Sequence, residues 1–568
     1  MSINWNLPAC QTGREIGNWK LDSRIRIALL LLTAFGFART YAQGEGGIPE
    51  MEIQIINPLK VTLPKAERNF SKVPALPIEP IMPPIVYDYA VIAFSTPSFS
   101  PPVRPLRIKP PELTVPSPNF VSAGFGNYNS PYLRSYISFF PVKSTTIGGL
   151  SFFHQSFAKG LVDDENSSSG TTSIMANIKS SNKSVATEAV AGFESRSANF
   201  YGYSPGIDVK KDTIKQTYQT YFLSGSISNS KKSDFNYEFR PSFSYLKDKY
   251  QAKESDLSLS LNSHYQMKGS NAVLINAAYS LVTRKDSAIA TKARHLFKVT
   301  PQYQFSPLEN LILKAGLTVV FENDSIGKKD FHIYPAASAT YHLGKNFGLF
   351  ASLTGDMEKV SLHTLSSENI WLNSQASIFH TNKTFDFSGG ITGDLGGGFG
   401  VVAGFDFARL KDYYLFQNDS LNQAKFNAVY DDVTRSNFFA AITFDKGNYS
   451  FRIKGDYYSY STDEQKAAWH RPKYKLDAYV VIKAASKLSI VPRLMVIGGM
   501  KAFDFGVASG QITSLSTAVD LSTSLEYNFS GKIGAFLRLN NLLNSDYSLN
   551  YHYPVRGFQA LAGFTWKF

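Results

Sequence analysis

Apolar and polar residues alternate along most of the chain, from about residue 119 to residue 568. In Leu257–Met267, LSLSLNSHYQM, a leucine stands at every second position up to Leu261, and polar residues stand between them. Tyr449–Tyr458 repeats the pattern with tyrosine, phenylalanine and isoleucine, and residues 474–482 follow it with one exception. Alternation with a period of two predicts β-strands that have one apolar and one polar face.

These alternating segments are long. They run for about ten to fourteen residues, whereas strands in soluble sheets usually have five or six. A tilted strand that crosses the hydrocarbon core of a membrane needs about nine to eleven residues. A soluble β-sandwich also alternates, so the pattern of residues alone leaves both kinds of sheet open.

Short turns and long polar loops separate the segments in regular alternation. The short turns are 229–233, 268–270, 306–308, 344–346, 395–398, 445–447, 485–487 and 529–532. The long loops are 159–168, 199–215, 247–254, 284–292, 323–330, 358–382, 412–433, 459–472, 500–516 and 541–556. Turns at one end of a sheet and loops at the other are typical of outer-membrane barrels, which have periplasmic turns and external loops. This scheme predicts 22 strands.

The final segment, LAGFTWKF, places Phe564, Trp566 and Phe568 on one face of a strand. An open sheet edge in lipid leaves backbone groups unsatisfied at several kcal/mol each. We therefore expect this strand to pair with the first one, with the three aromatic residues as a barrel-closing signature. The predicted fold class is all-β: a transmembrane antiparallel up-and-down β-barrel of about 22 strands, formed by residues 118–568.

Residues 1–42 have the pattern of a secretory signal peptide. Basic residues precede the apolar run Ile27–Ala38, and Thr40-Tyr41-Ala42 resembles a cleavage site. The only cysteine, Cys10, lies in this segment, so we expect no disulfide and no thiol chemistry in the mature chain. No later apolar stretch approaches the 18 residues that a membrane-spanning helix requires.

Residues 43–117 differ in composition from everything that follows. Sixteen of the 27 prolines lie between Pro49 and Pro118. Proline removes a backbone donor and holds its neighbours in extended conformations, so helices and central strands are disfavoured. We expect an extended, partly polyproline II segment in the periplasm. It would act either as an occluder of the barrel lumen or as a docking arm.

The net positive charge of the chain indicates which partners to expect. The formal charge is +13, and +10 remains once residues 1–42 are removed. An exported chain does not meet nucleic acid, so the basic excess favours anionic lipid head groups or an anionic solute. General solubility is the plainer alternative. Candidate lumen-lining residues are Arg452, Lys454, Lys473 and Lys475.

No pattern of catalytic or metal-binding residues stands out. The nine histidines are scattered, without a second ligand at metal-binding spacing. Acidic loops such as Leu161–Gly170 do not fit a calcium loop, and no helix follows the glycines at Gly396–Gly400. Every positive signal is architectural. We therefore expect no enzyme activity, no cofactor and no bound metal.

The C-terminal stretch resembles the end of TonB-dependent receptor barrels. Asn541–Asn544 (NLLN), Tyr547, Tyr553-Pro554, Gly557 and Phe568 match that family's N-L-x-N, Tyr, Tyr-Pro, Gly and final Phe. The proline-rich segment followed by GFGNY is similar to a plugless group from Bacteroidetes-type outer membranes. The resemblance implies a 22-stranded barrel in a Gram-negative outer membrane, with the N-terminal segment and the C-terminus in the periplasm.

These receptors carry a globular plug before the barrel, and here only residues 43–117 stand in its place. Within that segment, Glu52, Ile53, Gln54, Ile55 and Ile56 form a TonB-box-like candidate, being extended, apolar and led by an acid. A periplasmic energy-coupling or assembly partner would bind through residues 43–117. Without a standard plug, the resemblance extends to the barrel and not to energy-driven import.

The expected function is uptake or passage of an unidentified solute across the outer membrane. The main alternative is a non-transporting structural or docking component of an outer-membrane protein assembly, held through the proline-rich arm. A third hypothesis is that the protein is an adhesin that binds through its long surface loops. Outer-membrane lipid is the expected surrounding in all three cases.

Overall fold

A computed structural model describes residues 119–139, 145–204, 206–287, 292–324, 330–506 and 510–568. The expected signal peptide (1–42), the proline-rich segment (43–117) and the TonB-box-like candidate (Glu52–Ile56) lie outside the described residues. The predictions made for these segments therefore remain predictions.

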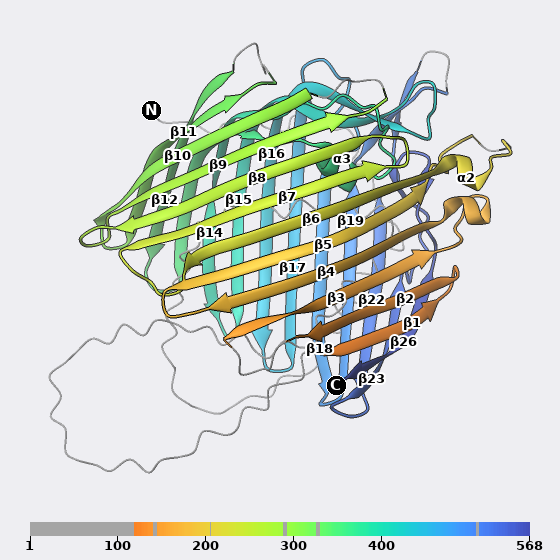
Figure 1. The fold of residues 1–568 in the computed structure, drawn as a ribbon, viewed down its shortest axis with the longest axis horizontal. Coiled ribbons are helices and arrows are strands. Elements are labelled where there is room, and N and C mark those ends of the chain that lie inside the picture. The colour runs from red at the N-terminus through yellow and green to blue at the C-terminus, as the bar shows by residue number, and fades with distance from the viewer. Residues whose placement is uncertain (1–118, 140–144, 205, 288–291, 325–329, 507–509) are drawn as a thin grey trace, which may run out of the picture. The chain divides into compact units, whose positions relative to one another are not determined.

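Among the described residues, 22 strands form one closed antiparallel sheet (Figure 1). The strands are β1 (Phe120–Gly126), β2 (Ser130–Ser138), β3 (Thr146–Phe157), β4 (Ser169–Ser181), β5 (Val185–Asn199), β6 (Lys215–Asn229), β7 (Phe235–Asp248), β8 (Lys253–Gln266), β9 (Ala272–Lys285), β10 (Lys292–Leu308), β11 (Leu311–Glu322), β12 (Phe331–Leu343), β13 (Phe347–Glu358), β14 (Thr381–Gly396), β15 (Phe399–Asn418), β16 (Phe426–Lys446), β17 (Tyr449–Thr462), β18 (Tyr474–Ala485), β19 (Leu488–Gly498), β22 (Ala518–Asn528), β23 (Ile533–Asn540) and β26 (Gln559–Lys567). Each strand pairs with the next one along the chain, and β26 pairs with β1. The predicted fold class and strand number are confirmed.

Small elements lie in the loops between these strands. Two short hairpins join β20 (Lys501–Asp504) to β21 (Gln511–Ser514) and β24 (Ser548–Asn550) to β25 (Tyr553–Pro554). The helical pieces are η1 (Asp164–Ser167), α2 (Lys211–Ile214) and α3 (Leu362–Glu368). In the part of the chain that the structure describes, no helix is long and apolar enough to cross a membrane.

The alternation in the sequence becomes an apolar outer face and a polar inner face. Leu223 is 58% exposed, Ile333 56% and Phe438 63%, each at a position that alternates with a residue turned inward. On the inner face, the hydroxyls of Ser258 and Ser280 hydrogen-bond across β8 and β9 at 2.8 Å. A sheet with exposed aliphatic and aromatic rows outside and polar rows inside is the pattern of a barrel in lipid.

The two ends of the barrel differ in the length of their connections. At one end the links are short, such as residues 397–398 and 447–448; at the other end, residues 359–380 and 541–558 join neighbouring strands. One predicted loop, 412–433, was too long, because β15 continues to Asn418 and β16 starts at Phe426. Aromatic residues of β15 are buried there, which favours continued strand pairing over a solvated loop.

Glycines bring the backbones close together where the barrel closes. Gly124 of β1 pairs with Gly563 of β26, and the ring of Phe536 lies near both of them. Phe568 directly follows β26, and its amide donates a hydrogen bond to the Asn119 carbonyl at 3.1 Å. Asn127 continues the pairing at the loop end, since its side-chain oxygen accepts from Ala560 N at 3.0 Å.

The residues of the expected closing signature lie along this seam. Phe564 is 66% exposed and Trp566 55% exposed, and both alternate with inward-turned residues of β26. The Trp566 and Phe568 rings stack with their centroids 4.6 Å apart. Their position on the apolar outer face is suited to contact with lipid.

Gly563→Val should destabilise the seam. An added Cβ would lie 2.2 Å from the Ala123 carbonyl oxygen and 2.4 Å from the Phe536 ring, so the backbone must shift at a cost of about 1–3 kcal/mol. We expect the folded, heat-modifiable band on a gel to be lost at a lower temperature. Gly455→Val is the matched control, since nothing lies within 4 Å of a Cβ there. Equal loss in both variants would contradict this role.

Candidate functional site

The largest buried apolar cluster that the structure describes lies at the long-loop end of the barrel. Its centre is the connection between β13 and β14, residues Lys359–His380, which we call the closing loop. The loop carries α3, which lies behind the strands of the near wall in Figure 1. Leu362, Leu365 and Leu372 of this loop are completely buried, and Trp371 is 3% exposed. The loop is therefore packed into the barrel mouth.

Local sequence and one wall residue together explain why α3 forms. The Ser361 hydroxyl caps the helix by accepting a hydrogen bond from Thr364 N at 3.1 Å. The carboxylate of Glu254, on β8, accepts from Leu362 N at 2.6 Å and from His363 N at 2.9 Å. An acidic group at a helix N-terminus is favourable because it satisfies free amides. The wall thus stabilises the helix of the loop.

Arginines of the barrel wall bind backbone carbonyls of the closing loop. Arg284, on β9, donates to Ala376 O at 2.6 Å and to Ser374 O at 2.7 Å. Arg196, on β5, donates to Ser366 O at 3.2 Å. Hydrogen bonds from charged donors are stronger than neutral ones. These contacts fix the loop to the wall formed by β5 to β10.

The same loop is bound on the other side of the mouth. Glu368, at the end of α3, accepts a hydrogen bond from the Tyr414 hydroxyl of β15 at 2.5 Å and pairs with Arg471 at 3.4 Å. Asn373 donates to Asn427 of β16 at 3.1 Å. Strands β5 and β15 are ten positions apart in a closed cycle of 22. Contacts from α3 to both strands mean that the loop spans the mouth between nearly opposite walls.

Aromatic packing fills the space beside the loop. The Trp371 ring stacks on Tyr553 with centroids 3.8 Å apart, and Tyr201 meets Trp371 edge-on at 5.8 Å. The Trp371 indole also donates to Asn199 O at 2.9 Å. Burial raises the pKa of Tyr201 to about 12, as expected where water is excluded. Packed aromatic rings, as well as hydrogen bonds, therefore hold the closing loop in the mouth.

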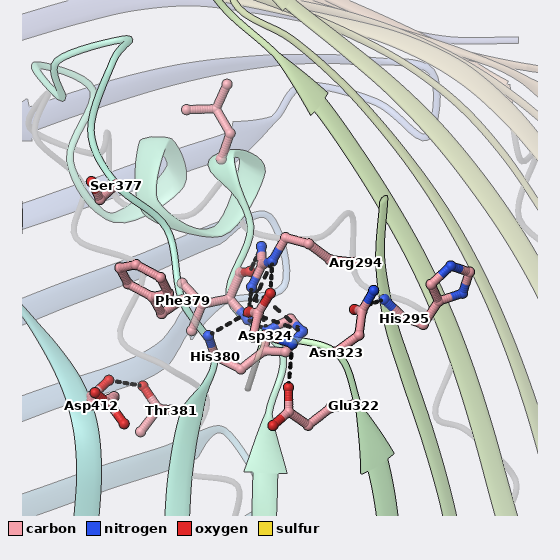
Figure 2. A network of polar contacts seen from close by, with 12 residues as sticks. Arg294, His295, Glu322, Asn323, Asp324, Ser377, Phe379, His380, Thr381 and Asp412 are labelled. Atoms are coloured by element: carbon pink, nitrogen blue, oxygen red, sulfur yellow. Dashed lines mark hydrogen bonds and ion pairs between the residues drawn. The ribbon is translucent and has the colours of Figure 1, made fainter. Parts of the chain in front are cut away.

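Figure 2 shows the polar network at the end of the closing loop, where Arg294 and His380 converge on Asp324. Arg294 Nε donates to Asp324 Oδ1 at 2.8 Å, and its Nη1 donates to Val360 O at 2.9 Å. His380 Nδ1 accepts hydrogen bonds from Arg294 Nη2 at 2.8 Å and from Val360 N at 3.2 Å. Both partners are donors only, so Nδ1 must be unprotonated.

Burial and the neighbouring Arg294 cation both favour the neutral imidazole of His380. Together they lower its pKa to about 3. Burial and the charge of Arg196 likewise lower the pKa of His363, in α3, to about 4. Both histidines of the closing loop are therefore neutral at neutral pH.

The residues predicted to line the lumen occupy one part of the wall. Arg452 and Lys454 lie on β17 and Lys475 lies on β18, on the face opposite the exposed Tyr449 and Tyr457. Lys473 precedes β18, where its backbone amide donates to Gly498 O at 2.9 Å. Lys473 is thus on a loop rather than on the strand face.

The closing loop was missed as a structural element by sequence reasoning, which treated 358–382 only as a long polar loop. Two signals were available: the apolar residues Leu362, Leu365 and Trp371, which a solvated loop would not require, and the helix cap at Ser361. Among the described residues there is no cluster of three or more His, Cys, Asp or Glu side chains suited to a metal ion.

Comparison with known proteins shows what the barrel is similar to. No protein-family model matches the chain, and the search of curated proteins found no match. Among solved structures, the ferripyoverdine receptor of the outer membrane of Pseudomonas aeruginosa matches with a TM-score of 0.60 and 12% identity, over 79% of this chain and 71% of that one.

Two further structures give the same result. The FrpB iron transporter from Neisseria meningitidis matches with a TM-score of 0.62 and 10% identity, over 80% of this chain and 82% of that one. The siderophore receptor PirA from Acinetobacter baumannii matches with a TM-score of 0.60 and 10% identity, over 79% and 80%. Identities this low show the fold alone. The chain therefore shares its barrel fold with these iron and siderophore receptors.

Proposed function

We propose that this protein is an outer-membrane barrel through which a solute crosses the membrane, and that the closing loop is the barrier in its lumen. The observation that carries the proposal is the span of the loop from β5 to β15. A barrier fixed between opposite walls regulates a passage, and it has no evident use in a barrel that only anchors other proteins. The fold shared with receptors for iron and siderophores supports the same conclusion.

We place the short turns in the periplasm and the closing loop at the outer surface, as in other outer-membrane barrels. After removal of residues 1–42, residues 43–117 would then lie in the periplasm. There they either occlude the lumen or bind an energy-coupling or assembly partner, with Glu52–Ile56 as the TonB-box-like contact. Arg452, Lys454 and Lys475 would line the path of the solute, with Lys473 at its entrance.

Passage is tested with a protein whose closing loop is removed. Glu358 and Thr381 are paired neighbours on β13 and β14, so a short Gly–Ser linker can replace residues 359–380 without opening the sheet. Proteoliposomes that hold this loop-replaced protein should swell in an isotonic solution of a small sugar. If they do not swell, with or without residues 43–117, the passage proposal is wrong and the docking component is favoured.

Deletion of residues 43–117 tests the proposed occluder. In the loop-replaced protein, this deletion should raise the single-channel conductance further, because the second barrier is then absent as well. An unchanged conductance would contradict occlusion and favour the docking arm. Affinity purification of the otherwise unaltered protein, with and without 43–117, then reports whether partners depend on the segment.

A further inference from the structure

The polar face of three neighbouring strands, β17, β18 and β19, is basic. These strands carry five cationic side chains and two carboxylates. The cations, which we call the basic ladder, are Arg452, Lys454, Lys475, Lys483 and Arg493. The carboxylates are Asp456 and Asp477. The excess of three positive charges lies within one part of the lumen wall.

Strand register places these residues on one face. Arg452 pairs with Tyr479, and Tyr479 pairs with Arg493, so one row crosses all three strands. In the rows nearer the loop end, Lys454 pairs with Asp477 and Asp456 pairs with Lys475. Directly paired residues of antiparallel strands point to the same side. The ladder therefore runs from the turn end toward the mouth.

The two carboxylates are already bound to cations of the ladder. Arg493 Nη2 lies 2.6 Å from Asp477 Oδ2, and Lys454 Nζ lies 3.3 Å from Asp456 Oδ1. Arg452 and Lys483 are exposed, and within the part of the chain that the structure describes neither has a carboxylate partner. Their charges are directed into the lumen without compensation on their own strands.

The opposite wall offers little compensation either. Strands β7 and β18 are eleven positions apart in the cycle of 22. Strands β7 and β8 carry four acids. Glu238 pairs with Arg240 at 2.7 Å, Glu254 accepts from the amides of α3, and Asp248 accepts from Gln216 at 3.1 Å. Asp256 pairs with Lys359 of the closing loop at 2.6 Å. All four acids are therefore bound by wall or loop partners, and none of them binds the ladder.

We propose that the basic ladder recognises the solute, which is an anion carrying several carboxylate or phosphate groups. This inference rests on the proposed passage and names the class of solute. Arginine binds such oxygens through a planar pair of donors, and lysine adds unspecific positive charge. Successive cations along the path let an anion move from one to the next, and rings or rows of such charges select ions in pores.

The test compares two variants of the loop-replaced protein in planar bilayers. Arg452→Gln with Lys483→Gln removes two ladder charges, and Lys231→Gln with Lys232→Gln removes two charges from an exposed turn at the same end of the barrel. Under a KCl gradient, the ladder variant should show a chloride-to-potassium permeability ratio at least about twofold lower than the control. Citrate and pyrophosphate, added separately, should block the control more strongly than the ladder variant, and the stronger blocker identifies carboxylate or phosphate chemistry.

Each outcome decides something. A control that conducts, with the same selectivity and the same block as the ladder variant, would overturn the role of the ladder while leaving passage intact. A control that inserts but does not conduct, both with and without residues 43–117, would overturn passage itself, and the assignment of an anionic solute with it. A heat-modifiable band on a gel confirms that both variants are folded before the currents are compared.

Discussion

The loop-replaced protein should conduct at least about tenfold more current per channel than the unaltered mature protein. The closing loop contacts nearly opposite walls through Ser366 and Glu368 and fills the mouth with buried side chains, including Leu365 and Trp371. A lumen closed by 22 strands is wide, and its resistance is set by its narrowest section. Removing that section leaves the wall intact, because β13 and β14 stay paired up to Glu358 and Thr381.

The matched control replaces residues 230–234, a connection at the short-turn end, with the same linker. This change should leave the conductance within about twofold of the unaltered protein, since the turn lies outside the mouth. If the loop-replaced protein conducts no better than this control, the closing loop is not the barrier. The measurement is single-channel current in planar bilayers at a fixed voltage, with folding checked by heat-modifiability.

Acidic pH should release the closing loop of the unaltered protein and so open its lumen. In the closed conformation the pKa of His380 is lowered to about 3 and that of His363 to about 4, whereas a released loop would titrate near the ordinary value of 6.5. Between these values the released loop binds more protons than the closed one, so falling pH favours release. The closed conformation is fully stable above pH 6.5 and loses stability as the pH falls toward 4.

The size of the acid effect follows from the same linkage. Each histidine destabilises the closed conformation by about 1.4 kcal/mol for every pH unit below 6.5. At pH 5, each histidine therefore shifts the equilibrium between the closed and the released loop roughly 30-fold toward release. Protonated His380 would also place a proton between Nδ1 and its two donors, Arg294 and Val360 N. We expect the probability of channel opening to rise steeply between pH 6.5 and 5.

Two substitutions separate this mechanism from general acid damage. His380→Asn keeps an acceptor near the Nδ1 position and cannot be protonated in this range, and His363→Gln removes the second titrating group. The double variant should stay closed at pH 5. Acid opening that is unchanged in this variant would show that other groups carry the response. His154→Asn, in β3 and outside the closing loop, is the control.

The barrel was predictable from the chain because its determinants are local. The period of two in segments such as Leu257–Met267 is set by the geometry of one strand with lipid on one side and a polar lumen on the other. Turn residues mark where each strand ends. The main error, the loop at 412–433, came from Asp412 and the polar residues after it, where aromatic packing in the mouth extends β15 and β16.

The closing loop was not predictable in the same way. Its position depends on contacts between residues far apart in sequence, such as Arg196 with Ser366 and Glu254 with Leu362. A single sequence shows that a loop contains leucines and a tryptophan, but not which wall receives them. The basic ladder was predictable in part. The sequence places Arg452 and Lys454 on a polar strand face, but only the register with β18 shows that Arg493 lies beside them.

The pairing of β1 with β26 has a consequence for biogenesis. The hydroxyls of Ser122 and Thr565 hydrogen-bond at 2.8 Å although 443 positions separate them. The ribosome completes β1 long before it makes β26, so the edge of β1 that β26 covers stays unpaired until the C-terminal segment is made. Slow delivery of the C-terminal segment should therefore increase aggregation, because an unpaired strand edge can pair with another chain.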